Sequence, residues 1–296
     1  MKHKILLISF TVLSLLFFGA QTTNAVTETG VISLEEQIKV LQEKIKYLQS
    51  LILNLKIQKE ISAESYLVMD ISNNSFILKK NVNQTHSIAS ITKLMNAVIT
   101  AENMKEDQSV ILTKEMLKPQ GYSPSLFLNL SVTVKNLLKA SLIQSTNDAA
   151  ESLSYIVGHD KFLGLMNQKA RDLGMKDTYY YDVHGLNPKN HSTATDLAKL
   201  VIYINKNHPE LWTITKDNDF WLPDPTGKML KFKNLNNFYQ TPEFIGGKTG
   251  YLKEAKESFA SLFELNGKTV AIVILRSVNS KADAIRIIDW VKSNSI

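Results

Sequence analysis

The sequence predicts an α+β domain built on one antiparallel sheet and preceded by a separate N-terminal helix. Two observations predict this fold class: strand-like segments stand at both ends of the globular part, and the patterns between them are helical, with apolar residues at spacings of three and four. The composition agrees, because 44% hydrophobic and 21% charged residues in a chain of 296 are typical of a globular protein. Strands at both ends around a helical middle favour a single sheet.

The first 25 residues have the three parts of an export signal. MKHK is positively charged, residues 5–20 are uncharged and apolar, and Thr23-Asn24-Ala25 offers small residues where a signal peptidase reads them. We therefore expect residues 1–25 to be a signal peptide and the protein to be exported. The alternative is an uncleaved segment that tethers the chain to a membrane, because the apolar run is just shorter than the ~20 residues of a spanning helix.

Residues 26–60 are predicted to be a linker followed by a coiled-coil helix. Ser33 and Glu36 form a capping-box pair. Apolar residues then recur at alternating steps of four and three, at Leu34, Ile38, Leu41, Ile45, Leu48, Ile52 and Leu55. Alternating isoleucine and leucine favours a parallel two-stranded coil, so residues 33–58 are predicted to bind a second copy or another helical partner. The alternative is one amphipathic helix that lies on the domain or on a membrane.

The globular domain is predicted to span residues 61–296. It opens with strands at Tyr66–Asp70 and Ser75–Lys79, joined by a turn at Asn73-Asn74. Helical patterns follow in SITKLMNAVITAENM, VKNLLKASLIQSTNDAAESLSYIV, HDKFLGLMNQKARDLGM and ATDLAKLVIYINKN. Strands in ESFASLFELN and KTVAIVILRSV meet at the Asn266-Gly267 turn signal, and a helix follows in KADAIRIIDWVKS.

Composition excludes several classes of function. The chain has no cysteine, which excludes disulfides, thiolate metal sites and a cysteine nucleophile. Its net charge of +6 is spread along the sequence without a basic block, so nucleic acid is not expected as a partner. The six histidines lack a metal-ligand spacing, and we expect neither a metal nor a cofactor.

A serine and a lysine stand three residues apart at Ser90 and Lys93. A serine hydroxyl is a weak nucleophile unless a base removes its proton, and residues three apart on a helix share a face. Lysine can be that base if burial lowers its pKa, and apolar neighbours surround this pair. Taken alone, however, the spacing is far more typical of an ordinary helix start with a solvated lysine.

Two further segments combine small and polar residues. Ser145-Thr146-Asn147 interrupts an apolar run, and its hydroxyl and carboxamide could relay a proton or hold an amide; a helix N-cap is the alternative. Gly246-Gly247-Lys248-Thr249-Gly250 would let a substrate approach a strand edge, with a hydroxyl and an ammonium facing an anionic group. The alternative there is a bulge or a turn.

In this order and spacing the three motifs resemble the active-site triplet of penicillin-binding proteins and class A β-lactamases. Residues 62–292 resemble the D-alanyl-D-alanine carboxypeptidases of serine peptidase family S11, in STNDAA, in DVHGLNPKNHSTATDLAKL and in FIGGKTGYLKEA. The resemblance implies a β-lactamase or transpeptidase-like fold, with helices on both faces of the sheet and an all-helical subdomain. It also implies a peptidoglycan stem peptide as substrate, β-lactams as acylating inhibitors, and action outside the cytoplasm.

The family's mechanism carries over residue by residue. It makes Ser90 the acylated nucleophile, Lys93 its base and Ser145 the proton relay to the leaving D-alanine. The remaining roles concern substrate binding. Asn147 would hold the peptide amide, Lys248 would keep the potential positive, and Thr249, beside Gly250 on the strand, would bind the terminal carboxylate. The backbone N–H groups of Tyr251 and Ser90 would form the oxyanion hole, and Lys281, ahead of Arg276 and Arg286, would be a further cation for the carboxylate.

Three alternatives accompany this function. A β-lactamase needs a glutamate in an ExxLN setting between the second and third motifs, and Glu151, Glu210 and Glu243 lack it, so penicillins should leave Ser90 slowly. An endopeptidase that cuts peptidoglycan cross-links would carry the same motifs. A catalytically retired scaffold, acting through the coiled coil on an envelope partner, usually loses its nucleophile or base, and both are present here.

Overall fold

The computed structural model describes residues 34–119 and 126–294. The chain divides into two compact units, Met1–Ile52 and Leu53–Ile296. The predicted signal segment and Ser33 of the predicted capping box lie outside the described residues.

A five-stranded antiparallel sheet, in the order β2-β1-β11-β10-β9, forms the centre of the second unit. Its strands are β1 (Ser65–Asp70), β2 (Ser75–Lys80), β9 (Phe244–Leu252), β10 (Lys256–Leu265) and β11 (Lys268–Ser277). Strands β10 and β11 pair up to Leu265 opposite Lys268, so Asn266 and Gly267, both with positive φ, form the two-residue turn. The predicted strands and the antiparallel central sheet are confirmed.

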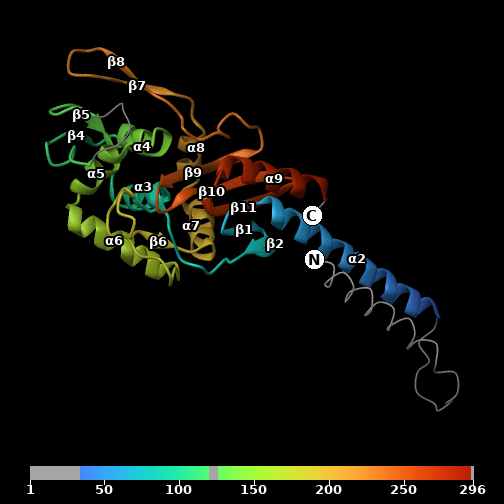
Figure 1. Cartoon of the computed structure of the whole chain (residues 1–296). Helices are drawn as coiled ribbons and strands as arrows, with labels where there is room; N and C mark the ends of the chain where they lie inside the picture. The colour runs from blue at the N-terminus through green and yellow to red at the C-terminus, as the bar shows by residue number, and fades with distance from the viewer. Residues whose placement is uncertain (1–33, 120–125, 295–296) are drawn as a thin grey trace. The chain divides into compact units, whose positions relative to one another are not determined.

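Successive side chains of β1 enter two different cores. Tyr66 and Val68 pack in one cluster and Leu67 and Met69 in the other, as the twofold period of a strand requires. Helix α9 (Ser280–Ser293) contributes to the first cluster, and α7 (Ala194–Asn207) to the second. Figure 1 shows these two helices on opposite sides of the sheet, which confirms the prediction of helices on both faces.

A group of helices, drawn mainly in green and yellow in Figure 1, lies beside the sheet and shares the larger core. Its members are α3 (Thr92–Asn103), α4 (Val134–Ile143), α5 (Asn147–Tyr155) and α6 (His159–Asp172). Helix α8 (Pro209–Lys216) packs against β9. Three two-stranded sheets, which the sequence did not predict, are β3–β6 (His86–Ser87, His191–Ser192), β4–β5 (Ser109–Ile111, Ser131–Thr133) and β7–β8 (Phe220–Pro223, Met229–Phe232).

The helical pattern around Ser145 is two helices rather than one. Helix α4 ends at Ile143 and α5 begins at Asn147. Between them Ser145 has a φ of +62°, a left-handed conformation that a non-glycine residue rarely adopts. Backbone strain of this kind is concentrated at functional sites.

Helix α2 (Leu34–Glu60) carries the predicted seam. The seam side chains of Ile38, Leu41, Ile45, Leu48, Ile52 and Leu55 are 46–55% exposed. Further along the helix, Ile57 is buried and belongs to the core cluster that also contains Tyr66 and Phe244. In the two ranges described, no helix combines the length and the apolar character needed to cross a membrane.

Candidate active site

Ser90 lies in a short 3₁₀ helix, Ala89–Ile91, directly before helix α3. Ala89 has a φ of +47°. Gly185, with a φ of +90°, packs so tightly on this turn that a Cβ atom there would collide with the Ala89 carbonyl oxygen. Gly250 on β9 packs from another side, because a Cβ there would lie 2.9 Å from the carbonyl oxygen of Ile88 and 3.1 Å from the Ser90 nitrogen. The serine turn is therefore held between two backbone segments.

Lys93 is fully buried beside Ser90. Its Nζ atom lies 3.0 Å from Ser90 Oγ, 2.7 Å from Asn147 Oδ1 and 2.6 Å from the His184 carbonyl oxygen. The last two partners are oxygens that can only accept, so they take two N–H groups. The third position of the nitrogen faces the Ser90 hydroxyl, which can itself donate. A neutral Lys93 amine fits this arrangement, with its lone pair aimed at the Ser90 proton.

The surroundings of Lys93 favour that neutral form. Burial lowers the pKa of Lys93 well below its usual value, and the nearby Lys248 lowers it further. The carboxylates of Asp182 and Asp148 oppose this by raising the pKa of Lys93. The neutral amine that a general base requires is thus populated well below pH 10.5.

Ser145 and Asn147 bring the second motif to the same place. Asn147 is the first residue of α5, and its carboxamide oxygen accepts the hydrogen bond from Lys93. Ser145 Oγ accepts a 2.9 Å hydrogen bond from Lys248 Nζ. The N-cap position belongs to Thr146, whose side chain makes no cap hydrogen bond. Neither Ser145 nor Asn147 is therefore the N-cap that the sequence offered as an alternative.

Strand β9 is an edge strand, and it carries the third motif. Gly246 and Gly247 let it approach its neighbours closely, since a Cβ at these positions would lie 2.6 Å from Trp212 and 2.7 Å from Ser261. Lys248 is 2% exposed, and burial lowers its pKa to about 7. Gly246 to Gly250 are thus part of a paired strand rather than a turn. The bulge offered as the alternative is represented by a register shift at Ile245, directly before Gly246.

A pocket of about 660 Å³ opens over these residues. Six of the nine predicted site residues line it: Ser90, Ser145, Asn147, Thr249, Gly250 and Tyr251. Lys93 and Lys248 are buried behind this lining, in contact with Ser90 and Ser145. Most of the predicted residues therefore come together, although they come from four separate elements.

Lys281 lies elsewhere. It is exposed on the first turn of α9, and the pocket is lined instead by its neighbour Ser280. Arg276 and Arg286, the other predicted cations, pair with Glu64 and Asp283. The lysine that does line the pocket is Lys253, in the turn after β9.

Lys253 and Glu257 are pocket residues that the sequence reasoning missed. Only the position of Lys253, three residues after Gly250, could have signalled it. Glu257 accepts hydrogen bonds from the backbone nitrogen and the hydroxyl of Ser280. In the part of the chain that the structure describes, no group of three His, Asp or Glu residues could hold a metal ion.

The fold and this constellation define a class of protein, the penicillin-binding serine peptidases. Within that class, the chain belongs to the D-alanyl-D-alanine carboxypeptidase family, Peptidase S11, whose model matches residues 53–279.

Curated and solved relatives agree with this membership. The chain is 31% identical over 255 residues to a D-alanyl-D-alanine endopeptidase of Escherichia coli, covering 81% of this chain and 80% of the relative. It is 25% identical to a D-alanyl-D-alanine carboxypeptidase of Mycobacterium tuberculosis, covering 72% and 74%. The solved DD-transpeptidase of Streptomyces K15 superposes with a TM-score of 0.71 at 27% identity, covering 78% and 97%. The β-lactamase or transpeptidase-like fold is thereby confirmed.

Proposed function

We propose that this chain is a serine-type D-Ala-D-Ala carboxypeptidase that removes the terminal D-alanine from peptidoglycan stem peptides. One observation carries the proposal: the fully buried Lys93 has its nitrogen 3.0 Å from the hydroxyl of the pocket residue Ser90. Burial favours the neutral form of the lysine, which can act as a base. The serine hydroxyl that this base activates faces the pocket, where it can reach a substrate. Family membership supplies the substrate class.

The reaction follows from these contacts in two steps. Lys93 takes the Ser90 proton while Oγ bonds to the carbonyl carbon of the scissile peptide bond. The bond to the terminal D-alanine breaks, and Ser145, hydrogen-bonded to Lys248, passes a proton to the leaving amine. Water then hydrolyses the acyl-enzyme ester and restores Ser90.

The remaining roles concern binding. We assign the peptide amide to Asn147 and the terminal carboxylate to Thr249, with Lys248 supplying positive potential when it is protonated. The oxyanion is assigned to the backbone N–H groups of Ser90 and Tyr251, beside Gly250; removing one such donor typically costs about 10²–10³ in rate. For the second cation, Lys253 is a better candidate than Lys281 because it lines the pocket.

An endopeptidase activity on peptidoglycan cross-links is the second candidate. The observation that favours it is the 31% identity to an enzyme named as an endopeptidase. The same acyl transfer would cleave either bond, so the difference depends on which leaving group the pocket accepts. A catalytically retired scaffold is the third candidate, and the contact between Lys93 and Ser90 speaks against it.

The test incubates the full chain with a stem pentapeptide that ends in D-Ala-D-Ala, and with a cross-linked dimer, beside a Ser90→Ala variant. Release of D-alanine that the variant lacks would support the carboxypeptidase. Cleavage of the dimer alone would shift the proposal to the endopeptidase. A folded wild-type chain that cleaves neither would leave the retired scaffold.

The arrangement of the whole chain is part of this proposal. Residues 1–25 would act as the export signal or as a membrane tether, because peptidoglycan lies outside the cytoplasm. Residues 26–60 would connect them to the catalytic domain at 61–296. The exposed seam of α2 would bind a second copy of the chain or an envelope partner. β-Lactams would acylate Ser90 as substrate mimics.

A further inference from the structure

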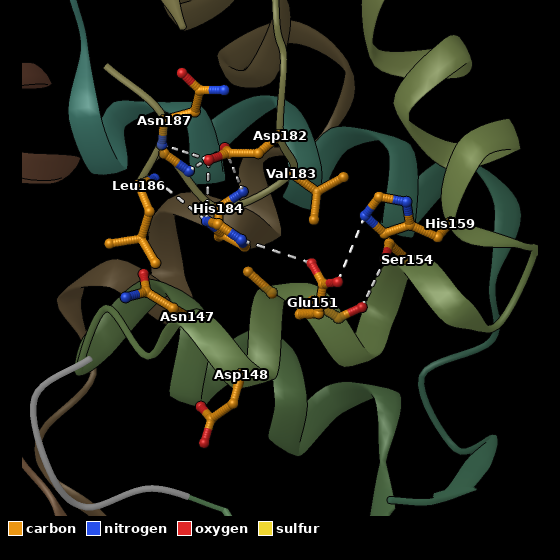
Figure 2. Close-up of polar contacts among 12 residues, drawn as sticks. Asn147, Asp148, Glu151, Ser154, His159, Asp182, Val183, His184, Leu186 and Asn187 are labelled. Carbon is orange, nitrogen blue, oxygen red and sulfur yellow. Dashed lines mark hydrogen bonds and ion pairs between the residues drawn. The ribbon is translucent and has the colours of Figure 1, made fainter. Parts of the chain in front are cut away.

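A buried group of acidic and imidazole side chains lies next to Lys93, and the proposed reaction does not use it. Glu151 on α5 is 7% exposed. One carboxylate oxygen, Oε2, lies 3.7 Å from His184 Nε2, and the other lies 3.5 Å from His159 Nε2 (Figure 2). Oε2 is buried and makes no hydrogen bond in the described structure. Buried carboxylate oxygens usually have a hydrogen-bond partner, so the Oε2 atom of Glu151, which has none within the described residues, suggests a role for this side chain.

The loop that carries His184 is built around a second carboxylate. Asp182 accepts hydrogen bonds from the backbone nitrogens of His184 at 3.1 Å, Gly185 at 2.6 Å and Asn187 at 2.5 Å. Figure 2 shows these contacts gathered on the Asp182 side chain. The backbone of residues 182–187 therefore has one defined conformation.

His184 lies between Glu151 and Lys93: its imidazole ring faces Glu151, and its backbone carbonyl oxygen contacts Lys93. Its Nδ1 atom accepts a 3.2 Å hydrogen bond from the Leu186 nitrogen and also lies 3.3 Å from Asp182 Oδ2. We assign the proton of the neutral ring to Nε2, which faces Glu151, because an Nδ1 atom that accepts from Leu186 carries no proton. Burial lowers the pKa of His184 to about 4, which keeps the ring neutral near pH 7. Its carbonyl oxygen accepts the 2.6 Å hydrogen bond from Lys93.

Helix α5 contributes two residues that act on Lys93, one directly and one through His184. Asn147 and Glu151 are four residues apart, so they share one face of the helix. Asn147 contacts Lys93 directly, while Glu151 reaches it through His184. One turn along α3 from Lys93, Asn96 donates 3.0 Å hydrogen bonds to the carbonyls of Ala150 and Val183, which ties the three segments together.

We propose that Glu151 is a positioning residue for Lys93. Its carboxylate, 3.7 Å from the Nε2 atom of His184, holds by electrostatic contact the residue whose carbonyl aims the Lys93 amine at Ser90. This inference rests on the proposed function, because it takes Lys93 to be the base that activates Ser90.

Other charged groups face this pair and enter its pH dependence. Lys93 is influenced by Lys248, Asp182 and Asp148. Glu151 is influenced by His159 on α6, by Asp182 on the loop and by Lys118, while burial raises its pKa. All of them remain in place in the variants below.

The test measures the rate at which a fluorescent penicillin acylates the full chain, from acidic to alkaline pH, in a Glu151→Leu variant. We expect the maximal rate to fall by about ten- to a hundredfold, as when a reacting group is misplaced by about an ångström. The rise of the rate with pH should also move to higher pH, because an amine released from its carbonyl acceptor gains access to water. Glu151→Gln keeps the shape of the side chain and an oxygen that can face His184 Nε2 but removes the negative charge, so part of the rate should return.

Asp160→Asn provides the matched control. Its carboxylate also contacts His159, at 3.3 Å, but lies on the surface, so its loss should change neither the rate nor the pH profile. A folded Glu151→Leu variant with the wild-type rate and an unmoved pH profile would overturn the inference. Failure of the wild-type chain itself to be acylated at Ser90 would contradict the proposed function instead.

A second measurement needs no destabilising variant. Nitrogen NMR of the wild-type histidines reports which ring nitrogen carries the proton. We expect His184 to be neutral near pH 7, with its proton on Nε2. A proton on Nδ1, or a charged ring at that pH, would remove the link to Glu151 and overturn the inference.

Discussion

The side chain of Lys248 donates a 2.9 Å hydrogen bond to the hydroxyl of Ser145. This bond joins an edge strand to the strained residue between α4 and α5, across 103 positions of sequence. Lys248 also acts on Lys93, whose pKa it lowers. A single buried lysine thus contacts the proposed proton relay and, when protonated, also lowers the pKa of the base.

The first prediction concerns pH. Lys93 must be neutral to accept the Ser90 proton, so acylation by penicillin should rise with pH, with a midpoint well below 10.5. Since a positive Lys248 disfavours a positive Lys93, Lys248→Met should raise the pKa of Lys93 and move this midpoint to higher pH. Stopped-flow acylation at a series of pH values measures the shift. A midpoint that stays fixed would show that Lys248 does not tune the base.

The second prediction concerns the support of the serine turn. In Gly185→Ala the new Cβ would collide with the carbonyl oxygen of Ala89. The alanine would also have to adopt a positive φ, which residues other than glycine rarely do. We expect a loss of about 1–3 kcal/mol in the free energy of unfolding and at least a tenfold fall in acylation rate. Gly164→Ala on α6 is the control, because its Cβ enters open space, and it should leave acylation unchanged. Equal activity of the two variants would contradict the tight packing of Gly185.

The third prediction decides between two lysines. Lys253 lines the pocket and Lys281 does not, so Lys253→Ala should raise the KM for peptides with a free terminal carboxylate several-fold. It should leave kcat nearly unchanged, because a binding contact present in both ground and transition state affects KM. Lys281→Ala is the comparison, and steady-state kinetics on the pentapeptide distinguish them. The reverse ranking would restore the assignment made from sequence.

The fourth prediction concerns the seam of α2. Ile45 is 54% exposed there, so Ile45→Glu should abolish self-association or partner binding through this helix. Glu43→Lys, an exposed residue on the face of the helix opposite the seam, should leave association intact. Light scattering of the full chain over a range of concentrations gives the mass directly. A wild-type chain that stays monomeric would leave an envelope protein as the remaining partner.

Most of the candidate residues that meet in the structure could be chosen from the sequence, because acyl transfer restricts which residue types can perform it. Ser90, Ser145 and Thr249 reach one pocket, although no single motif established this by itself. The sheet was predictable for a related reason, since alternating strands and the Asn266-Gly267 turn carry their signal locally.

What the sequence did not predict depends on contacts between distant segments. The break between α4 and α5 places Ser145 where it accepts the hydrogen bond from Lys248, whereas the helical pattern of the sequence continues through this segment. Lys253 lines the pocket and Lys281 does not, a difference that depends on how β9 and α9 are placed in the fold. Glu151 resembles any helical glutamate until His184 is found beside it.

The most direct test of the account is to treat the full chain with benzylpenicillin and to locate the adduct by mass spectrometry of its peptides. We expect one penicilloyl group per chain, on Ser90, which persists for long times and is absent from Ser90→Ala and strongly reduced in Lys93→Ala. A folded chain that takes up no penicillin, or that carries the adduct on another residue, would contradict the assignment of Ser90 as the nucleophile activated by Lys93.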